Sequence, residues 1–286
     1  MISVSIIFRA SQNTAQPAPA PYNVFSKIEA VDIPSSGSFA GEPIPLSSFD
    51  VKERLDRELL VNTYWHSNTL QLFKLASRYF PVIEAILKEN GVPEDFKYMA
   101  LAESGLRNAV SGSNAVGFWQ IIESSGKELG LEVNNMVDER YHIDLSTAAA
   151  CKYLKNAHKE FGSWTLAAAS YNMGKTRLRK ILREQKVNSY YDLFMNDETS
   201  RYVFRIIALK EIISNSRKYG FFLDRNDLYE PIPCTTINVE QEIDDLAAFA
   251  LENGTNYKTL KLLNPWLRQP YFKLKRGKTY ELKLPS

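Results

Sequence analysis

Glu103 is the residue of this sequence whose type and position most directly suggest chemistry. It ends the nearly unbroken apolar segment 96–102, and Gly105 is expected to end the helix that this segment forms. Apolar neighbours hydrate a carboxylate poorly, and the negative end of the helix dipole faces it. Both effects raise its pKa above the ~4.3 of a free glutamate. Such a glutamate can donate a proton near neutral pH.

Two further segments hold side chains suited to binding a sugar beside such an acid. Ser111 precedes a run, opened by a glycine, that holds Trp119 and Gln120, and Tyr171 and Asn172 lie near the end of a later helix. An aromatic ring can stack on a sugar while an amide reads its hydroxyl groups. Each segment also has a structural interpretation, with Trp119 as a core residue and Tyr171 as a core tyrosine with a satisfied hydroxyl.

The elements that must position these residues are helical. Between residues 50 and 220, apolar residues recur at helical spacing, and glycines and prolines lie at the expected helix ends. After residue 220 the pattern predicts a strand, two short helices and a second strand, at 235–239, 244–253, 256–264 and 278–284. The predicted fold class is therefore mainly α, with an all-helical domain followed by a small βααβ module.

The chain is expected to have three parts, over residues 1–48, 49–222 and 223–286. In the first part, segments 11–21 and 35–48 are rich in Ala, Pro, Ser, Gln or Gly, which is typical of an extended tether. The apolar start, Met1–Phe8, is either a clipped export signal or a disordered end. The second part would carry the chemistry, and the third would be the βααβ module.

The overall composition excludes several classes of function. A net charge of +2 over 286 residues gives no electrostatic reason to expect a nucleic-acid partner. No run approaches the ~18 apolar residues of a membrane span, although membrane attachment stays open. Cys151 and Cys234 are far apart, and the three histidines show no metal-ligand spacing. Neither a disulfide framework, a metal nor another cofactor is therefore expected.

Taken together, the separated motifs resemble the soluble lytic transglycosylase domain family, which has a goose-lysozyme-like fold. The motifs are, in order, Glu103-Ser104, then Gly117-x-Trp119-Gln120, then Tyr171-Asn172-x-Gly174, supported by Asp138–Arg140, Ser146–Ala149 and Glu198–Val203. They point to the subgroup similar to membrane-bound lytic murein transglycosylase D. The resemblance covers about residues 56–220.

The tail has a resemblance of its own. Asp245-Leu246, Asn256–Lys261, Leu263–Leu267 and Leu284-Pro285 resemble a lysin motif, a βααβ fold that binds glycans containing N-acetylglucosamine. Its usual Gly-Asp-Thr-Leu entry reads Gln-Glu-Ile-Asp in this chain, at 241–244. A purely structural cap is the alternative interpretation of this module.

The resemblance implies roles for individual residues. Glu103 matches the single catalytic acid and base of the family, and Ser111 and Gln120 match groups that line the sugar cleft. Tyr171 matches a tyrosine whose hydroxyl binds the catalytic carboxyl, with Asn172 beside it. The implied reaction cleaves the β-1,4 bond between N-acetylmuramic acid and N-acetylglucosamine without water and leaves 1,6-anhydromuramoyl ends. The implied partners are peptidoglycan glycan strands, and the implied location is the bacterial cell envelope, with the periplasm as the expected compartment.

Two other functions stay open at this point. A goose-type lysozyme-like hydrolase would share the fold but would need a second carboxylate to activate water. Asp138, Glu139 and Asp144 are the candidates for that carboxylate. The other alternative is a catalytically silent scaffold that only binds peptidoglycan.

Overall fold

The computed structural model describes residues 28–286. The expected export signal, and the part of the expected tether before residue 28, lie outside the described residues. The chain divides into two units, Met1–Ala30 and Val31–Ser286. All contacts described below lie within the second unit.

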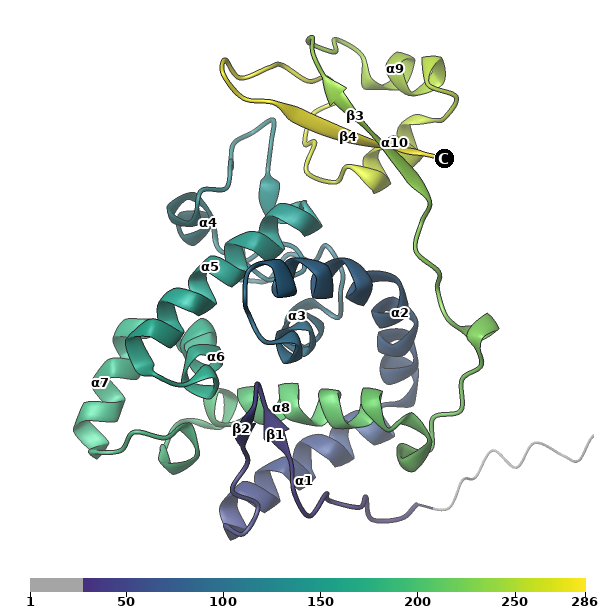
Figure 1. Cartoon of the computed structure of the whole chain (residues 1–286). Coiled ribbons are helices and arrows are strands. Elements are labelled where there is room, and N and C mark those ends of the chain that lie inside the picture. The colour runs from purple at the N-terminus through teal and green to yellow at the C-terminus, as the bar shows by residue number, and fades with distance from the viewer. Residues whose placement is uncertain (1–27) are drawn as a thin grey trace, which may run out of the picture. The chain divides into compact units, whose positions relative to one another are not determined.

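The first part of this second unit is built from α-helices (Figure 1). They are α1 (Phe49–Tyr64), α2 (His66–Glu89), α3 (Lys97–Ser104), α4 (Glu123–Leu129), α5 (Ile143–Phe161), α6 (Trp164–Met173), α7 (Lys175–Gln185) and α8 (Asp197–Ser214). Short 3-10 turns occur at Glu94–Phe96, Glu139–Tyr141, Tyr190–Asp192, Ser216–Tyr219 and Arg225–Asp227. The predicted helical character of this region is confirmed.

Helix α8 is the central helix of this part. Its buried apolar residues occur on most of its faces, which is typical of a helix enclosed by others, and they are Tyr202, Val203, Phe204, Ile206, Ile207, Ala208, Leu209 and Ile212. It packs against α1, α3 and α6. Figure 1 shows it between α1 and α3. Side chains of α8 therefore reach the last turn of α3, where Glu103 lies.

Helix α3 ends where the sequence predicted. Gly105 has a φ of 61°, in the left-handed region that glycine adopts without strain, and its N–H bonds the Leu101 carbonyl at 2.9 Å. The helix buries Tyr98, Met99, Ala100 and Leu101. That packing fixes the turn that follows.

Residues 31–48 correct part of the tether prediction. Ser38–Phe39 (β1) and Glu42–Pro43 (β2) pair as an antiparallel hairpin. Phe39 is fully buried, and its ring packs edge-on against Phe96 with centroids 5.3 Å apart. The composition of segment 35–48 did not predict this hairpin, because a single buried aromatic residue, Phe39, fixes where a segment rich in serine, glycine and proline packs.

The hairpin also caps a helix that lines the candidate site. Glu42 accepts hydrogen bonds at 2.5–2.9 Å from the hydroxyls of Ser163 and Thr165 and from the backbone N–H groups of Trp164 and Thr165. These groups form the N-terminus of α6, where a carboxylate satisfies otherwise unpaired donors. Glu42 thus anchors α6 from a distant part of the chain.

The C-terminal module (residues 234–286) has the predicted βααβ order. Its elements are β3 (Cys234–Val239), α9 (Leu246–Glu252), α10 (Tyr257–Leu263) and β4 (Tyr280–Pro285). The two strands pair antiparallel, from Cys234 opposite Pro285 to Val239 opposite Tyr280. The predicted fold class, mainly α with a small α+β module, is confirmed. Within residues 28–286, no helix is both long and apolar enough to cross a bilayer.

Candidate active site

Glu103 lies where two cavities meet. The larger, about 990 Å³, is lined by Glu103 together with Ser111, Gln120, Tyr171, Asn172 and Glu198, among others. The smaller, about 480 Å³, is lined by Glu103 together with Glu58, Trp65, Arg107, Arg201 and Arg205, among others. We call the two cavities together the Glu103 groove. The structure therefore brings together five of the six residues that the sequence singled out.

The Glu103 carboxyl is held near the midpoint of its titration at neutral pH. It accepts a hydrogen bond from the Tyr202 hydroxyl, whose oxygen lies 2.5 Å from Oε1. Burial is the largest influence and raises the pKa of Glu103 to about 7, while the Tyr202 bond and the Arg205 charge act in the opposite direction. The carboxyl can therefore hold a proton at neutral pH and also exist as its conjugate base.

Arg205 is tied to a buried carboxylate on another helix. Glu58 of α1 is 1% exposed, and its carboxylate lies 2.5 Å from Nε of Arg201 and 3.6 Å from Nε of Arg205. The two arginines are one turn apart on α8. The negative charge of Glu58 offsets the positive charge that they bring to the groove, and this agrees with the raised pKa of Glu103.

Ser111 and Gln120 belong to one loop, residues 109–121, which we call the groove loop. Val116 bridges to both Val110 and Ile121 within it. The Gln120 amide nitrogen donates to the Ala109 carbonyl at 3.1 Å and to the Gly117 carbonyl at 2.9 Å. The loop therefore has a defined shape, and its polar side chains form one wall of the groove.

Tyr171 does not have the partner that the resemblance implied. Its hydroxyl donates to the Trp119 carbonyl at 2.7 Å, whereas Tyr202 binds the Glu103 carboxyl. The reason is the packing of α8 on α3, which places Tyr202 beside Glu103, while Tyr171 reaches from α6 to the groove loop. Burial raises the pKa of both phenols well above the ordinary value, so both keep their protons at neutral pH.

Trp119 is a core residue and not part of the groove wall. Its side chain is fully buried, and its indole N–H donates to the Thr147 hydroxyl at 2.8 Å. The proposed stacking of a sugar on this ring is therefore wrong. The structural interpretation, with Trp119 inside and Gln120 at the surface of the loop, is the correct one.

Sequence reasoning missed Tyr202, Arg205 and Glu58. Tyr202 lay within the motif Glu198–Val203, which supported the resemblance but was given no role of its own. The available signal for Glu58 was a charged residue between Leu55 and Leu59, which are both buried. A carboxylate on the apolar face of a helix needs a cationic partner from elsewhere in the fold.

The acids proposed for a hydrolytic mechanism are engaged elsewhere. Asp138 pairs with Arg140 at 2.7 Å, Glu139 with Lys278 at 2.5 Å, and Asp144 with Lys283 at 2.7 Å. Within the described chain, none of the three lines the Glu103 groove. Nor do three or more His, Cys, Asp or Glu side chains in residues 28–286 form a group that could hold a metal ion.

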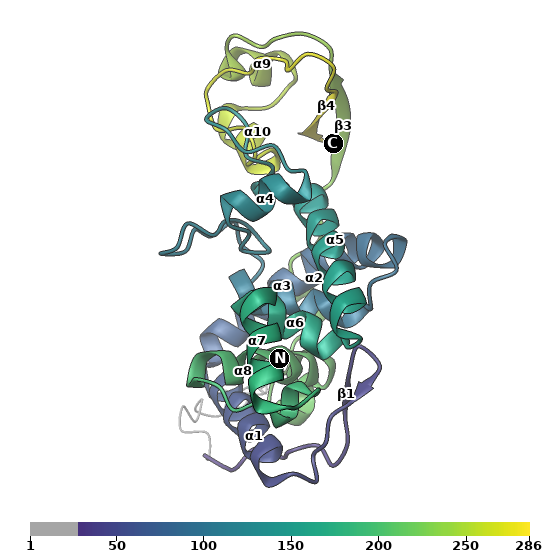
Figure 2. The same cartoon turned by 90° about the vertical axis from the view of Figure 1, so that its left-hand side faces the viewer.

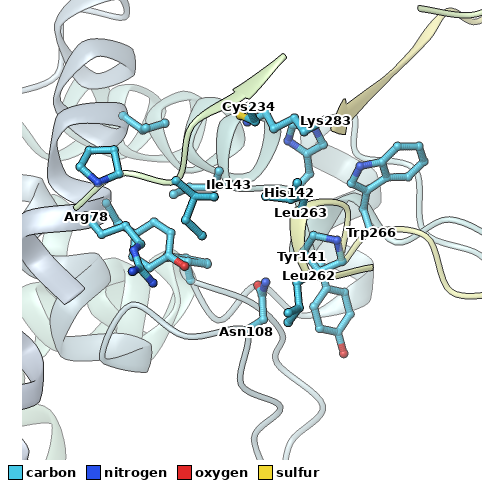
Figure 3. A pocket seen from close by; sticks show the side chains of 16 residues that line it. Arg78, Asn108, Tyr141, His142, Ile143, Cys234, Leu262, Leu263, Trp266 and Lys283 are labelled. Carbon is cyan, nitrogen blue, oxygen red and sulfur yellow. The ribbon is translucent and has the colours of Figure 1, made fainter. Parts of the chain in front are cut away.

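A separate cavity of about 160 Å³ lies where the helical part meets the C-terminal module. Figure 3 shows Tyr141 and His142 from one side beside Leu263 and Trp266 from the other. The His142 and Trp266 rings are 6.2 Å apart, and burial lowers the pKa of His142. This cavity marks a packed junction that does not include Glu103.

Comparison with known families finds two matched regions. Residues 80–194 match the transglycosylase SLT domain, and residues 235–286 match the soluble lytic transglycosylase C-terminal LysM-like domain. Similar proteins include the following relatives. Membrane-bound lytic murein transglycosylase D of Escherichia coli (strain K12) is 30% identical over 220 residues, covering 75% of this chain and 47% of that protein. A putative tributyltin chloride resistance protein of Alteromonas sp. (strain M-1) is 28% identical over 113 residues, covering 39% and 55%.

The chain thus spans about half the length of these relatives. Among solved structures, an inactive mutant of the lytic transglycosylase Slt of Pseudomonas aeruginosa shares 21% identity, with a TM-score of 0.39, over 53% of this chain and 26% of that one. The 70 kDa soluble lytic transglycosylase of Escherichia coli shares 17% identity, with a TM-score of 0.41, over 54% and 27%.

Proposed function

The chain combines a transglycosylase SLT domain with the C-terminal LysM-like domain of the soluble lytic transglycosylases, and from this premise we propose that it cleaves peptidoglycan without water. The bond is the β-1,4 linkage between N-acetylmuramic acid and N-acetylglucosamine, and the products carry 1,6-anhydromuramoyl ends. One observation carries the proposal. The Glu103 carboxyl has a pKa of about 7, lies where the two cavities of the groove meet, and accepts a hydrogen bond from the Tyr202 hydroxyl.

In the first step Glu103 acts as an acid. Its proton goes to the glycosidic oxygen as the bond from that oxygen to C1 of the muramic acid breaks. The neighbouring acetamido oxygen stabilises the positive charge that develops at C1. This step needs the protonated carboxyl, which the raised pKa supplies at neutral pH.

In the second step the same carboxyl acts as a base. Glu103, now a carboxylate, removes the proton from the C6 hydroxyl of the muramic acid, and O6 bonds to C1 as the acetamido oxygen leaves. The carboxyl ends protonated, as it began, and no water is consumed. The Tyr202 hydroxyl stabilises the intermediate carboxylate and fixes its orientation.

A hydrolase with the same groove is the main alternative. It would require a second carboxylate positioned to activate water. Glu198 is exposed and lines the larger cavity together with Glu103, so it is the candidate that the geometry offers for that role. This observation makes Glu198→Gln the matched control for Glu103→Gln.

Mass spectrometry of digested sacculi tests the proposal. The native chain should release anhydro products, each lighter by one water than the hydrolytic product. Glu103→Gln should lower the rate by about 10²–10⁴-fold, the usual range for loss of a general acid, while Glu198→Gln should retain most of the activity. Hydrated products that need Glu198 would support the hydrolase instead. If the native chain releases nothing yet binds sacculi, the chain is a scaffold.

The proposed partner of the whole chain is the peptidoglycan glycan strand, with the C-terminal module contributing to its binding. The proposed location is the bacterial cell envelope, in the periplasm, where that substrate lies. Cosedimentation of the Glu103→Gln chain with purified sacculi measures binding without turnover. If the Glu103→Gln chain still binds sacculi, glycan binding does not depend on the catalytic carboxyl.

A further inference from the structure

We propose that the C-terminal module is a positioning element of the Glu103 groove, beyond any glycan binding of its own. It would act through residues 131–141, which we call the connecting segment, and through Arg140 to the groove loop. The inference rests on the proposed function where it concerns catalysis. The structural link itself can be tested without any turnover.

The module is joined to the connecting segment by backbone contacts. Val137 forms a bridge with Leu267, the Asp138 N–H donates to the Trp266 carbonyl at 2.9 Å, and the Arg268 N–H donates to the Met136 carbonyl at 2.8 Å. Figures 1 and 2 both show the module next to the loop that follows α4. Because these are backbone hydrogen bonds, they fix the conformation of the connecting segment as well as holding it against the module.

Lys278 secures the same contact with charge. Its Nζ donates to Glu132 at 2.8 Å and to Glu139 at 2.5 Å, and the two acceptor side chains are only 9% and 6% exposed. The Tyr280 hydroxyl also donates to Glu132, at 2.8 Å. Removing Lys278 would leave two poorly hydrated carboxylates without their shared cation, which is costly for the local structure.

Arg140 carries the contact from the connecting segment to the groove loop. Its Nε and Nη2 donate to the two Asp138 carboxylate oxygens at 2.9 and 2.7 Å, which fixes the plane of the guanidinium. Its Nη1 donates to the carbonyls of Asn114 and Ile121, both at 3.2 Å. A Cβ on Gly117 would lie 2.1 Å from the Arg140 carbonyl oxygen, so the loop is pressed directly onto this residue.

The groove loop also shares a hydrophobic core with the module. Val116 of the loop is buried in one cluster with Val137 and Tyr141 of the connecting segment and with apolar residues of the module, among them Leu246, Leu260, Trp266, Leu267, Phe272 and Tyr280. Loosening the module would therefore expose the underside of the loop that holds Ser111 and Gln120.

The expected consequence is a loss of catalytic efficiency without global unfolding. The polar wall of the groove would be free to move by fractions of an ångström relative to Glu103. A displacement of about 1 Å caused by a distant substitution can cost about 100-fold in rate. A partial loosening should therefore lower kcat/KM by about tenfold or more, even on a soluble glycan fragment too short to reach the module.

The test compares two lysines that each bind two carboxylates. Lys278→Met breaks the contact with the connecting segment, whereas Lys273→Met breaks pairs with Glu242 and Asp244 inside the module. Hydrogen exchange should show protection of the Val116 and Ile121 amides falling by about tenfold in Lys278→Met only. kcat/KM on the soluble fragment should fall in parallel, and Lys278→Arg should restore both.

Equal exchange rates in the two methionine variants would overturn the proposal, whether or not the chain is active. If Lys278→Met does not fold, Arg140→Lys replaces it, because that change keeps the charge and removes Nη1, which donates to the Asn114 and Ile121 carbonyls of the groove loop. Retained protection of the loop amides in Arg140→Lys would also overturn the proposal. A chain with no turnover but with the predicted exchange pattern would refute the proposed function alone.

Discussion

The Tyr202 hydroxyl lies 2.5 Å from Oε1 of Glu103, and this bond joins the central helix α8 to the last turn of α3. It favours the charged form of the carboxyl and so opposes the effect of burial. In Tyr202→Phe, the pKa of Glu103 should therefore rise further. The descending limb of the pH profile of kcat should move to higher pH, and the maximal rate should fall because the carboxylate loses its orienting donor.

Tyr171→Phe is the matched control, since that hydroxyl binds the Trp119 carbonyl. It should leave the descending limb of the profile in place while it weakens the groove loop. If Tyr171→Phe moves the limb and Tyr202→Phe does not, the assignment of the two tyrosines is reversed.

The buried Glu103 carboxyl should make the chain less stable as pH rises. Its folded pKa of about 7 exceeds the ordinary 4.5, so the folded state holds the extra proton between these values. The stability that this proton contributes is fully present below pH 4.5 and is lost as the pH rises to the folded-state pKa of about 7. Relative to the native chain, Glu103→Gln should gain roughly 2–3 kcal/mol in unfolding free energy between pH 4.5 and pH 8. Urea unfolding at the two pH values measures this gain, and a difference that does not change with pH would contradict it.

The hairpin carboxylate Glu42 should show the opposite dependence on pH. Burial acts to raise its pKa, but the hydrogen bonds from Thr165, Trp164 and Ser163 outweigh burial and lower the pKa. The stability that the Glu42 carboxylate contributes is therefore present above the ordinary pKa of a glutamate. It is lost as the pH falls through the lowered pKa of Glu42 in the folded chain. Glu42→Gln should cost about 2 kcal/mol at pH 7 and less in acid. The exposed Glu89→Gln should change little, and an equal loss in both variants would argue against the cap.

Trp119 and Asn172 should separate stability from binding. Trp119→Phe loses the buried bond to Thr147, so its unfolding free energy should fall by about 1–3 kcal/mol while KM is unchanged. Asn172 is exposed in the larger cavity, so Asn172→Ala should raise KM and leave stability unchanged. Urea unfolding and steady-state kinetics on one soluble glycan measure both quantities. A raised KM in Trp119→Phe would restore its role in the groove wall.

Local signals in the sequence were sufficient for the elements and for the carboxyl whose pKa is raised. Apolar periodicity located the helices, glycine marked the end of α3, and alternation located the last strand, because these patterns act over a few residues. The raised pKa of Glu103 followed from its immediate apolar neighbours. The groove residues Ser111, Gln120, Tyr171 and Asn172 were recognised through the order of their motifs.

Only the tertiary structure decided which side chains meet. That Tyr202 binds Glu103, that Trp119 faces the core, and that Glu42 caps α6 depend on how segments more than 25 residues apart pack. The contact between Lys278 and the connecting segment is of the same kind. Apolar periodicity and composition describe each segment alone. These contacts instead depend on how several helices pack around α8 and on which side chains that packing buries.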